Sequence, residues 1–419
     1  MRERISRFIC LTRKYGLALS VKKLALYFRA SCIDKFAILS IRQKRNVRHT
    51  ISHALEGDFQ RIIIRRSSFG YSVPLFQRPQ HIACSMAKQG CLIFYEVSTM
   101  TDGIRGIKKL RDNLYLVNLT DIFTNHILTR SVADMDVPRY IEVYSTDRKM
   151  RKKDLIRYKE MGFDIIYQFV DHISPEISGT DRVPHSITEK YQFAIEDPDV
   201  FIVATADALY DDIVSQRGKH RCVLATNGVD LSYFSRLEKF TLSDDFNAAA
   251  TRGLPVVCYY GALASWLDYE LLKKIDETNN FTVVLIGIKY DGSYESLKGL
   301  KNTYFLGHKN YGELKYYARA CDVMMIPFKI GEISRSTSPV KLFEYMAIGR
   351  PIVCTDMDEC RKYESVLIGK SHSEFISMLR FALTLIENED YKKCLRREAE
   401  MNDWNKKAEE IISLLSEGE

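Results

Sequence analysis

The chain has 419 residues, of which 46% are hydrophobic and 27% are charged, a composition typical of a folded globular protein with two or three domains. The net charge of +7 is unevenly distributed. Residues 1–50 hold 13 Lys and Arg against two acidic residues, a charge of +11, so the remainder carries −4. The ten cysteines show no CxxC spacing and no HExxH occurs, which argues against a zinc site or a disulfide framework.

No apolar stretch approaches the roughly 20 residues that a membrane-spanning helix needs. Arg7 and Arg13 interrupt the apolar region that a signal peptide would require. Widely spaced cysteines are also typical of reduced thiols in the cytosol. We therefore expect a cytoplasmic protein.

Residues 1–57 are predicted to form a basic helical extension. Leu17, Val21, Leu24 and Phe28 fall on one helical face, although the apolar stripe is imperfect. A basic arm of this kind suits an anionic membrane surface or a nucleic acid. The alternative is that the apolar face packs on the next domain while the charges stay solvated.

From residue 59 onward, short apolar runs typical of β-strands alternate with helical stretches. These runs fall at 61–64, 92–95, 114–117, 141–144, 164–167, 200–203 and 222–224, and then, after a polar stretch, at 256–260, 281–286, 303–306, 323–326 and 352–355. Alternating strands and helices predict parallel sheets with right-handed crossovers. We predict an α/β protein with two Rossmann-like, doubly wound domains at 58–245 and 246–372. Helices over 373–419 are expected to close across both domains.

The segment from Ser334 to Val353 is the most informative part of the sequence. It follows a strand-like run, Ser338 is a good N-cap, and Pro339 suits the first helical position. Gly349 would end the helix. The N-terminus of such a helix offers free N–H groups and the positive end of its dipole, which together favour an anion.

Two charged residues lie on one face of this predicted helix. Lys341 is in the first turn, where a lysine opposes the dipole unless an anion is present, and Glu344 follows three residues later. A lysine for a diphosphate and a carboxylate for ribose hydroxyls form a coherent pair. The alternative interpretation is a well-capped surface helix with a solvated ion pair.

The sixteen residues from Ser338 to Val353, SPVKLFEYMAIGRPIV, closely resemble the donor-site helix of GT-B-fold glycosyltransferases. They look most like the retaining group that builds bacterial lipopolysaccharide, capsule and wall polysaccharides. Other segments that resemble the family occur in the family's order, at 77–81, 86–90, 204–209, 226–230, 259–268, 285–287 and 402–404. The resemblance covers roughly residues 59–415 and implies a GT-B fold with an acceptor domain followed by a donor domain.

The resemblance also implies roles for individual residues. The donor-binding candidates are Gly261, Gly287, Arg335, Ser336, Ser338, Pro339, Lys341 and Glu344. Glu344 matches the second glutamate of the family's E-x7-E motif, which holds the nucleotide ribose, whereas Ser336 replaces the first glutamate. The loop at 262–266 lacks the family's Arg and Lys. Lys341 and Arg335 are therefore the candidates for the positive charge that the leaving diphosphate requires.

The acceptor domain offers fewer candidates. Asp171 and His172 follow a strand-like run, so we expect them at a carboxyl strand end, with Asp171 as the better candidate for contacting a sugar. The alternative is a helix-capping aspartate beside an ordinary histidine. Arg78 is expected either to face the cleft or to pair with a carboxylate. Asp171, His172 and Lys341 are thus the catalytic candidates.

Taken with the resemblance, these residues predict an enzyme that moves a sugar from a nucleotide diphosphate-sugar to a saccharide, in lipid-linked form, during surface polysaccharide synthesis. It would act at the inner face of the membrane, docked through residues 1–50, without a nucleic-acid partner. We expect no metal and no cofactor, because none of three Asp-x-Asp tripeptides follows a clear strand of the first sheet, and a helix dipole and basic side chains can replace a metal. Two alternatives stay open: a catalytically weak binding subunit, and a GT-B sugar-nucleotide epimerase.

Overall fold

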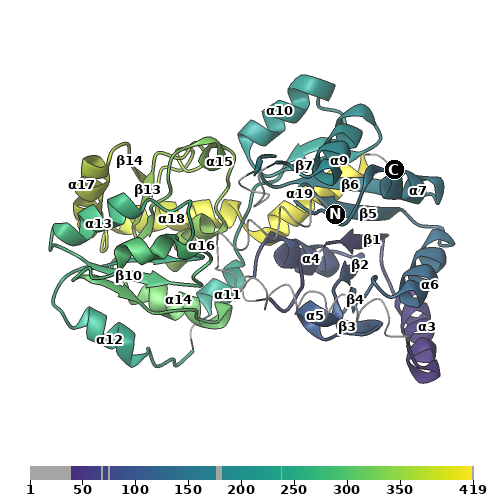
Figure 1. Ribbon diagram of the computed structural model, residues 1–419, viewed down its shortest axis with the longest axis horizontal. Coiled ribbons are helices and arrows are strands. Elements are labelled where there is room, and N and C mark those ends of the chain that lie inside the picture. Colours follow the sequence, from purple (N-terminus) through teal and green to yellow (C-terminus); the bar gives the residue numbers. More distant parts are fainter. Residues whose placement is uncertain (1–38, 68, 74–75, 176–181, 237, 418–419) are drawn as a thin grey trace. The chain divides into compact units, whose positions relative to one another are not determined.

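The computed structural model describes residues 39–417 except 68, 74–75, 176–181 and 237. Within it the chain forms two compact units, one of residues up to Thr226 together with Lys407 onward, and one of Asn227–Lys406. Each unit is a parallel β-sheet flanked by helices (Figure 1). The predicted α/β architecture with two Rossmann-like domains is confirmed. In the described part of the chain, no helix has the length and apolar character needed to cross a bilayer.

The first unit is built on an eight-stranded sheet with the order β3-β4-β2-β1-β5-β6-β7-β8. Its strands are β1 (Arg61–Arg66), β2 (Cys91–Glu96), β3 (Ile107–Arg111), β4 (Leu114–Val117), β5 (Arg139–Tyr144), β6 (Asp164–Phe169), β7 (Phe201–Ala204) and β8 (Cys222–Leu224). Only the edge strand β3 runs antiparallel to its neighbour. The sequence prediction missed this strand, because three of the five residues of IKKLR are basic and give no apolar run.

Helices cover both faces of this sheet. They are α3 (Ile41–Leu55), α4 (Arg78–Lys88), α5 (Thr99–Asp102), α6 (Ile122–Ala133), α7 (Lys152–Glu160), α9 (His185–Glu196), α10 (Asp207–Arg217) and the larger part of α19 (Trp404–Ser416). In β1, Ile62 and Ile64 join the core under α3, α6, α7, α9 and α10. Ile63 points to the opposite face, as the two-residue period of a strand requires.

The second unit has a six-stranded, fully parallel sheet with the order β11-β10-β9-β12-β13-β14. Its strands are β9 (Val256–Tyr260), β10 (Thr282–Ile286), β11 (Thr303–Phe305), β12 (Val323–Ile326), β13 (Ile352–Thr355) and β14 (Val366–Gly369). In chain order this is the 3-2-1-4-5-6 arrangement of a dinucleotide-binding fold, whose strand order reverses between β9 and β12. Ligands of such folds bind beyond the carboxyl ends of the strands at that reversal.

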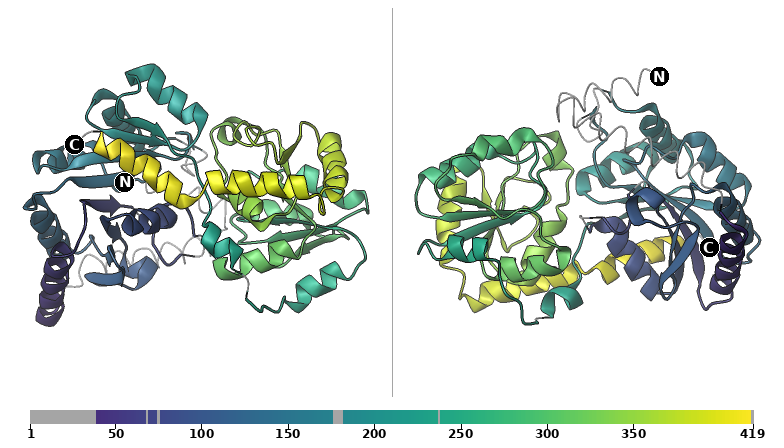
Figure 2. Two further views of the ribbon diagram at one scale, coloured as in Figure 1. Left: turned by 180° about the vertical axis from the view of Figure 1, so that it is seen from behind. Right: turned by 60° about the horizontal axis from the view of Figure 1, so that its bottom comes forward.

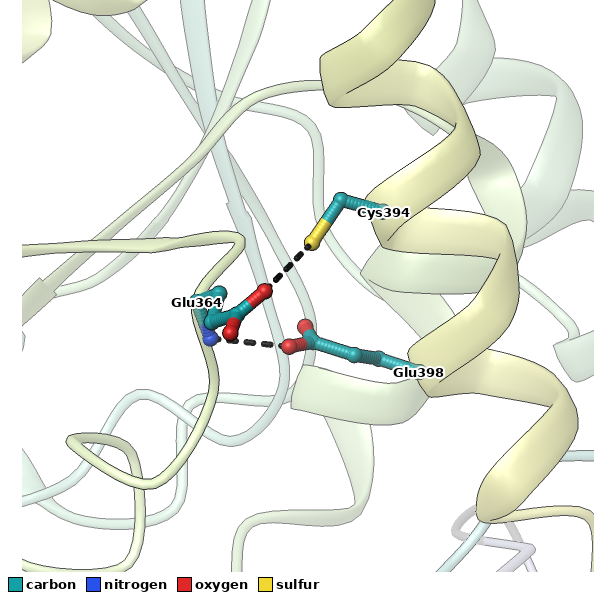
Figure 3. Close-up of side chains that lie close together, drawn as sticks. All are labelled: Glu364, Cys394 and Glu398. Atoms are coloured by element: carbon teal, nitrogen blue, oxygen red, sulfur yellow. Dashed lines mark hydrogen bonds between the residues drawn. The ribbon is translucent and has the colours of Figure 1, made fainter.

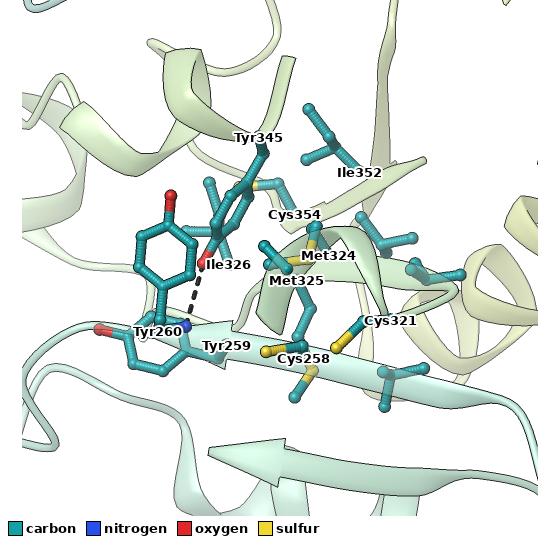
Figure 4. Packing of buried hydrophobic residues seen from close by; sticks show 14 of the residues in the cluster. Cys258, Tyr259, Tyr260, Cys321, Met324, Met325, Ile326, Tyr345, Ile352 and Cys354 are labelled. Atoms are coloured by element: carbon teal, nitrogen blue, oxygen red, sulfur yellow. Dashed lines mark hydrogen bonds between the residues drawn. The ribbon is translucent and has the colours of Figure 1, made fainter. Parts of the chain in front are cut away.

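The helices of the second unit surround this sheet (Figure 2). They are α11 (Leu231–Ser235), α12 (Asp244–Ala250), α13 (Tyr269–Glu277), the 3-10 helix η1 (Gly292–Leu297), α14 (Tyr311–Arg319), α15 (Glu332–Arg335), α16 (Val340–Ile348), α17 (His372–Leu383) and α18 (Glu389–Met401). Figure 4 shows the sulfur-rich core beneath α16, where Cys258, Met324 and Cys354 pack beside Tyr345. The Tyr345 hydroxyl accepts a hydrogen bond from the backbone N–H of Tyr260 at 3.1 Å.

The boundaries of the two units differ from the predicted ones. The division falls at Thr226 and not at residue 245, because Val229, Phe234 and Phe246 pack into the core of the second unit. α17 and α18 also belong to the second unit, whereas α19 belongs to the first from Lys407 onward.

The predicted N-terminal extension is in part a component of the first unit. Leu39, Val47, Ile51 and Ala54 are buried in its core, so α3 is packed and not a free arm. Residues 1–38, with the predicted stripe of Leu17, Val21, Leu24 and Phe28, lie outside the described residues.

Candidate functional site

Two glycines follow β9 and β10 at the carboxyl edge of the second sheet. Gly261 and Gly287 have φ angles of 145° and 150°, which favour glycine. A Cβ atom on Gly287 would lie 1.8 Å from the Gly261 carbonyl oxygen, and one on Gly261 would lie 3.0 Å from Cε of Lys341. The structure therefore brings three predicted donor-site residues together, next to bare backbone at the strand reversal.

The start of α16 differs in detail from the prediction. Pro339 is the N-cap, with φ −75° and ψ 117°, and the helix begins at Val340. Ser338 is not the cap; its hydroxyl and carbonyl oxygens instead accept hydrogen bonds from the backbone N–H and the side chain of Asn227, at 3.4 and 2.5 Å. The helix ends at Ile348 with Gly349 in the left-handed conformation, as predicted. The first turn remains close to Gly261, and within it the Leu342 N–H donates a hydrogen bond to the Pro339 carbonyl at 3.0 Å.

Lys341 lies in this first turn with aromatic rings around its ammonium group. Its Nζ atom is 5.5 Å from the ring centre of Tyr259 and 5.0 Å from that of Phe328. Desolvation lowers the pKa of Lys341 to about 8, and the charge of Glu344 opposes that effect. Among the described residues, none forms a hydrogen bond or an ion pair with this ammonium group. An anion bound at this position would supply the missing partner.

Glu344 is 4% exposed, one turn further along the same helix. Its Oε2 atom accepts a hydrogen bond of 2.8 Å from the Tyr260 hydroxyl, and the Tyr311 hydroxyl also interacts with the carboxylate. Burial raises the pKa of Glu344, while Tyr260, Tyr311 and Lys341 act to lower it. The interpretation of a solvated Lys341–Glu344 ion pair is wrong, because the carboxylate is buried and tyrosines contact it.

The two tyrosines were not predicted as site residues. Tyr260 is the last residue of β9, directly before Gly261, and Tyr311 is the first residue of α14. The sequence signal for Tyr260 was present, since a strand residue next to a site glycine lies at the carboxyl edge of the sheet. Tyr311 could not be found this way, because only the fold brings α14 beside α16.

The remaining donor-side candidates lie just before α16. Arg335 ends the short helix α15 and is exposed, whereas Ser336 and Ser338 are buried. Ser336, at the position of the missing glutamate, is 3% exposed. A neutral side chain therefore occupies that place.

The acceptor-side candidates belong to the first unit. Asp171 lies in a bend just beyond β6, where burial raises its pKa to about 7. Within the described residues its carboxyl group has no hydrogen-bond partner. It does not lie directly before a helix, because the next three residues, 172–174, are not helical. His172 is exposed. A carboxyl group that titrates near neutral pH is suited to accept or donate a proton.

Arg78 has a structural position. It is the first residue of α4 and is 4% exposed. Its guanidinium group donates hydrogen bonds to the Gln168 side chain at 3.2 and 3.3 Å and to the Thr226 carbonyl at 2.9 Å. The predicted partner was a carboxylate, but these partners are neutral. Burial lowers the pKa of Arg78 to about 10.

One group of described side chains has the spacing of a metal site, namely Glu364, Cys394 and Glu398 (Figure 3). Its ligand atoms are already engaged in the protein. Glu398 accepts hydrogen bonds from the backbone of Glu364 and from Ser365, and Glu364 forms an ion pair of 2.7 Å with Arg397. This group therefore connects the loop before β14 to α18.

A surface hollow of about 860 Å³ lies elsewhere in the second unit, between the end of α13 and the start of α17. It is lined by Lys274, Glu277, Thr278, Lys370, Ser371, His372, Ser373 and Ile376. None of the predicted site residues lines it. We therefore locate the candidate site by its charged and glycine residues, beyond the carboxyl ends of β9 and β12 where the strand order reverses, and not by the size of the hollow.

The sequence around these residues is similar to that of a known protein family. Residues 253–381, which include Gly261, Gly287, Lys341 and Glu344, match the family model described as glycosyl transferases group 1. This part of the chain is therefore similar to a group 1 glycosyltransferase domain, and the fold is that of GT-B proteins. The predicted family resemblance is thereby confirmed.

One curated relative is a Bacillus subtilis protein named as a teichuronic acid biosynthesis glycosyltransferase, TuaH. It is 24% identical over 259 residues, which cover 58% of this chain and 64% of the relative. The match thus spans less than two thirds of the relative's length.

Solved structures share the GT-B fold at low sequence identity. Sucrose-phosphate synthase from Thermosynechococcus elongatus aligns with a TM-score of 0.60 at 13% identity, covering 85% of this chain and 98% of that chain. Anabaena HepE, solved in complex with UDP-glucose, aligns with a TM-score of 0.58 at 14% identity, covering 85% of this chain and 99% of that chain. These similarities support the two-domain fold.

Proposed function

We propose that this protein transfers a sugar from a nucleoside diphosphate-sugar to a saccharide acceptor. The observation that carries the proposal is the cluster at the strand reversal of the second unit. There the Lys341 ammonium group forms no hydrogen bond or ion pair with any described residue, and it lies beside the backbone of Gly261, one turn from buried Glu344. UDP or a UDP-sugar occupies the solved structures of Anabaena HepE, which supports a uridine nucleotide as the first donor to test.

The donor's parts fit the chemistry of the cluster. The diphosphate would lie at the N-terminus of α16, against Lys341 and the Gly261 backbone, and the ribose hydroxyls would donate hydrogen bonds to Glu344. During transfer the bond between the anomeric carbon and the diphosphate oxygen breaks, and its electron pair stays on that oxygen. Lys341 stabilises the charge that develops there, so neither a metal ion nor a cofactor is part of the proposal.

The acceptor hydroxyl forms the new bond to the anomeric carbon and loses its proton. Asp171 is the proposed proton-handling or sugar-binding group of the first unit, since burial raises its pKa to about 7. His172, exposed beside it, is the alternative for this role. Retention at the anomeric carbon is proposed from the family resemblance alone.

The acceptor is proposed to be a lipid-linked saccharide of a surface polysaccharide, used at the inner face of the membrane. The name of the Bacillus subtilis relative supports a saccharide polymer. The basic N-terminal residues 1–50 support work at an anionic membrane surface.

A panel of sugar nucleotides tests the proposal. The protein, incubated with each donor and with lipid-linked or free saccharides, should release a nucleoside diphosphate from one donor and should do so faster with its acceptor. No release from any donor would contradict transfer.

The structure also favours one alternative, a nucleotide-sugar-binding subunit with little activity. Ser336, buried at the position of the motif's first glutamate, cannot supply a negatively charged contact to the sugar. Tight nucleotide binding without release of nucleoside diphosphate in the same panel would identify this alternative.

A further inference from the structure

The outer face of α3 concentrates positive charge on a rigid helix. Ser40 and Gln43 form a capping box that fixes the start of the helix at Ile41. The helix contains four Lys or Arg residues and no Asp or Glu. Ile41, Lys44, Arg45 and Arg48 have the spacing i, i+3, i+4 and i+7, so they form one stripe. The neighbouring stripe, with Val47 and Ile51, is buried in the core, which holds the basic stripe outward.

Two isoleucines on this surface are almost fully exposed. Ile41 is 83% exposed and Ile122, at the start of α6, is 82% exposed, the two highest values among the large hydrophobic side chains described. They belong to packed elements, because Lys44 and Arg48 lie over the ring of Phe123, at 5.3 and 5.2 Å from its centre. α3 and α6 lie against each other in both figures that show them (Figures 1 and 2).

The adjacent edge strand extends the positive charge. β3 exposes Lys108 and Lys109, and α3 packs on this edge, since a Cβ atom on Gly106 would lie 2.7 Å from Val47. Asp112 pairs with Lys109 at 2.8 Å and offsets its charge, and Asp121 accepts a hydrogen bond from the backbone N–H of Thr124. Lysines also protect an edge strand from pairing, so β3 alone would not indicate a partner.

We propose that the outer face of α3, with the start of α6 and the exposed lysines of β3, is a docking surface for an anionic lipid bilayer. The inference rests on the proposed function, because a lipid-linked acceptor requires work at a membrane. The basic side chains meet anionic headgroups, and Ile41 and Ile122 enter the interface between headgroups and acyl chains. The isoleucines decide in favour of lipid, because a nucleic acid would leave them in water.

Vesicle binding by the full-length protein tests this surface. Co-sedimentation is measured with vesicles of phosphatidylglycerol and phosphatidylcholine, and with phosphatidylcholine alone, at low and high salt. Binding should occur to the anionic vesicles and weaken with salt. The double variant Arg42→Glu/Arg45→Glu should bind at least about tenfold more weakly. Both arginines are exposed residues of α3 and therefore lie on its outer face, beside or within the basic stripe, so folding should be unaffected.

The apolar contribution is tested separately by the double variant Ile41→Ser/Ile122→Ser. It should bind the anionic vesicles roughly tenfold more weakly at unchanged net charge, because each apolar side chain no longer leaves water. Two controls match these changes on exposed positions of the second unit: Lys274→Glu/Lys370→Glu for charge, and Phe381→Ser/Met401→Ser for apolar surface. Neither control should alter vesicle binding.

Release of nucleoside diphosphate without vesicles separates this inference from the proposed function. All four variants should keep the wild-type rate, whatever their vesicle binding. Equal binding to neutral vesicles, or no binding to anionic ones, would overturn the docking surface and leave the transferase proposal intact. The docking surface would also be overturned if removal of residues 1–38 abolished vesicle binding while the α3 and isoleucine variants bound normally. Tighter binding to RNA than to vesicles, together with normal vesicle binding by the isoleucine variant, would overturn it as well.

Discussion

The Tyr260 hydroxyl lies 2.8 Å from Oε2 of Glu344 and donates a hydrogen bond to it. The two residues come from the end of β9 and the middle of α16, on either side of the strand reversal. The contact holds a buried carboxylate in one orientation before any ligand arrives. Because Tyr260 acts through Glu344, we regard it as a positioning residue.

Replacing Tyr260 with Phe should weaken nucleotide binding in a pH-dependent way. Burial raises the pKa of Glu344, and the tyrosine hydrogen bond favours the charged form, so losing that bond raises the pKa further. Affinity should then fall as pH is lowered, with a midpoint at higher pH than in the wild type. Titration calorimetry across pH measures this. Tyr294→Phe in η1 is the control, and identical pH profiles would remove Tyr260 from this role.

Glu344→Gln should reduce affinity for a nucleoside diphosphate by about 2–4 kcal/mol, through weaker hydrogen bonds to ribose. The amide keeps the shape of the side chain and can still accept from Tyr260. Glu344→Ala is a poorer variant, because it would leave Tyr260 and Tyr311 hydroxyls buried without their acceptor. The 2′-deoxy and 3′-deoxy nucleotides serve as the second arm of the titration. A variant that still discriminates against both analogues as the wild type does would contradict ribose binding by Glu344.

Lys341→Met should lower kcat by on the order of 100-fold or more, because positive charge is lost where the leaving diphosphate becomes more negative. The wild type should also bind nucleoside diphosphate less tightly as pH rises through about 8, where the free ammonium group loses its proton. The variant should lack this pH dependence. Lys329→Met, on an exposed neighbour, is the control. Full turnover by Lys341→Met would transfer the role to another base such as Arg335.

Gly287→Ala should destabilise the second unit by several times as much as Gly349→Ala. Both glycines have positive φ, but a Cβ atom on Gly287 would lie 1.8 Å from the Gly261 carbonyl, whereas one on Gly349 meets open space. Gly349→Ala is the control, and it should lose only about 1 kcal/mol of stability, from conformational strain at positive φ. Thermal unfolding of both variants measures the difference, and equal melting temperatures would contradict the close approach of the two loops.

Asp171→Asn should stabilise the protein and slow transfer. Its pKa is about 7 in the folded protein and about 4 in an unfolded chain, so between these values the folded state holds the proton that the unfolded state has lost. Wild-type stability therefore falls as pH rises from about 4 to 7. The asparagine variant should melt at the same temperature near pH 4 and at a higher one near pH 8. A constant difference across pH would show that Asp171 is not a desolvated acid.

Much of the second unit could be predicted from sequence, because β9, β10, β12 and β13 are buried on both faces and appear as apolar runs. The boundaries of β9, β12 and β13 coincide with the predicted ones. β14, with the sequence VLIG, was missed, because it directly follows a polar loop and no apolar run was assigned there. The end of α16 could also be predicted, because a helix commonly ends at a residue in the left-handed conformation and Gly349 adopts that conformation without a steric penalty.

The site was only partly predictable. Lys341 and Glu344 could be found because both lie in one contiguous segment with a family resemblance. The aromatic rings of Tyr259 and Phe328 around Lys341 depend on the pairing of β9 with β12, which no local pattern reveals. Arg78 shows the opposite case, a basic residue whose partners are set by burial and not by function.

Binding of a diphosphate at Lys341 can be measured by chemical labelling of the lysines. An amine with a pKa of about 8 is partly deprotonated at that pH and therefore reactive toward an acylating reagent. Acylation of each lysine is measured by mass spectrometry, first without ligand and then with UDP and other nucleoside diphosphates. We expect the nucleotide accepted in the donor panel to protect Lys341 while Lys274 and Lys329 react as before. Unchanged labelling of Lys341 at a saturating concentration of that nucleotide would contradict such binding.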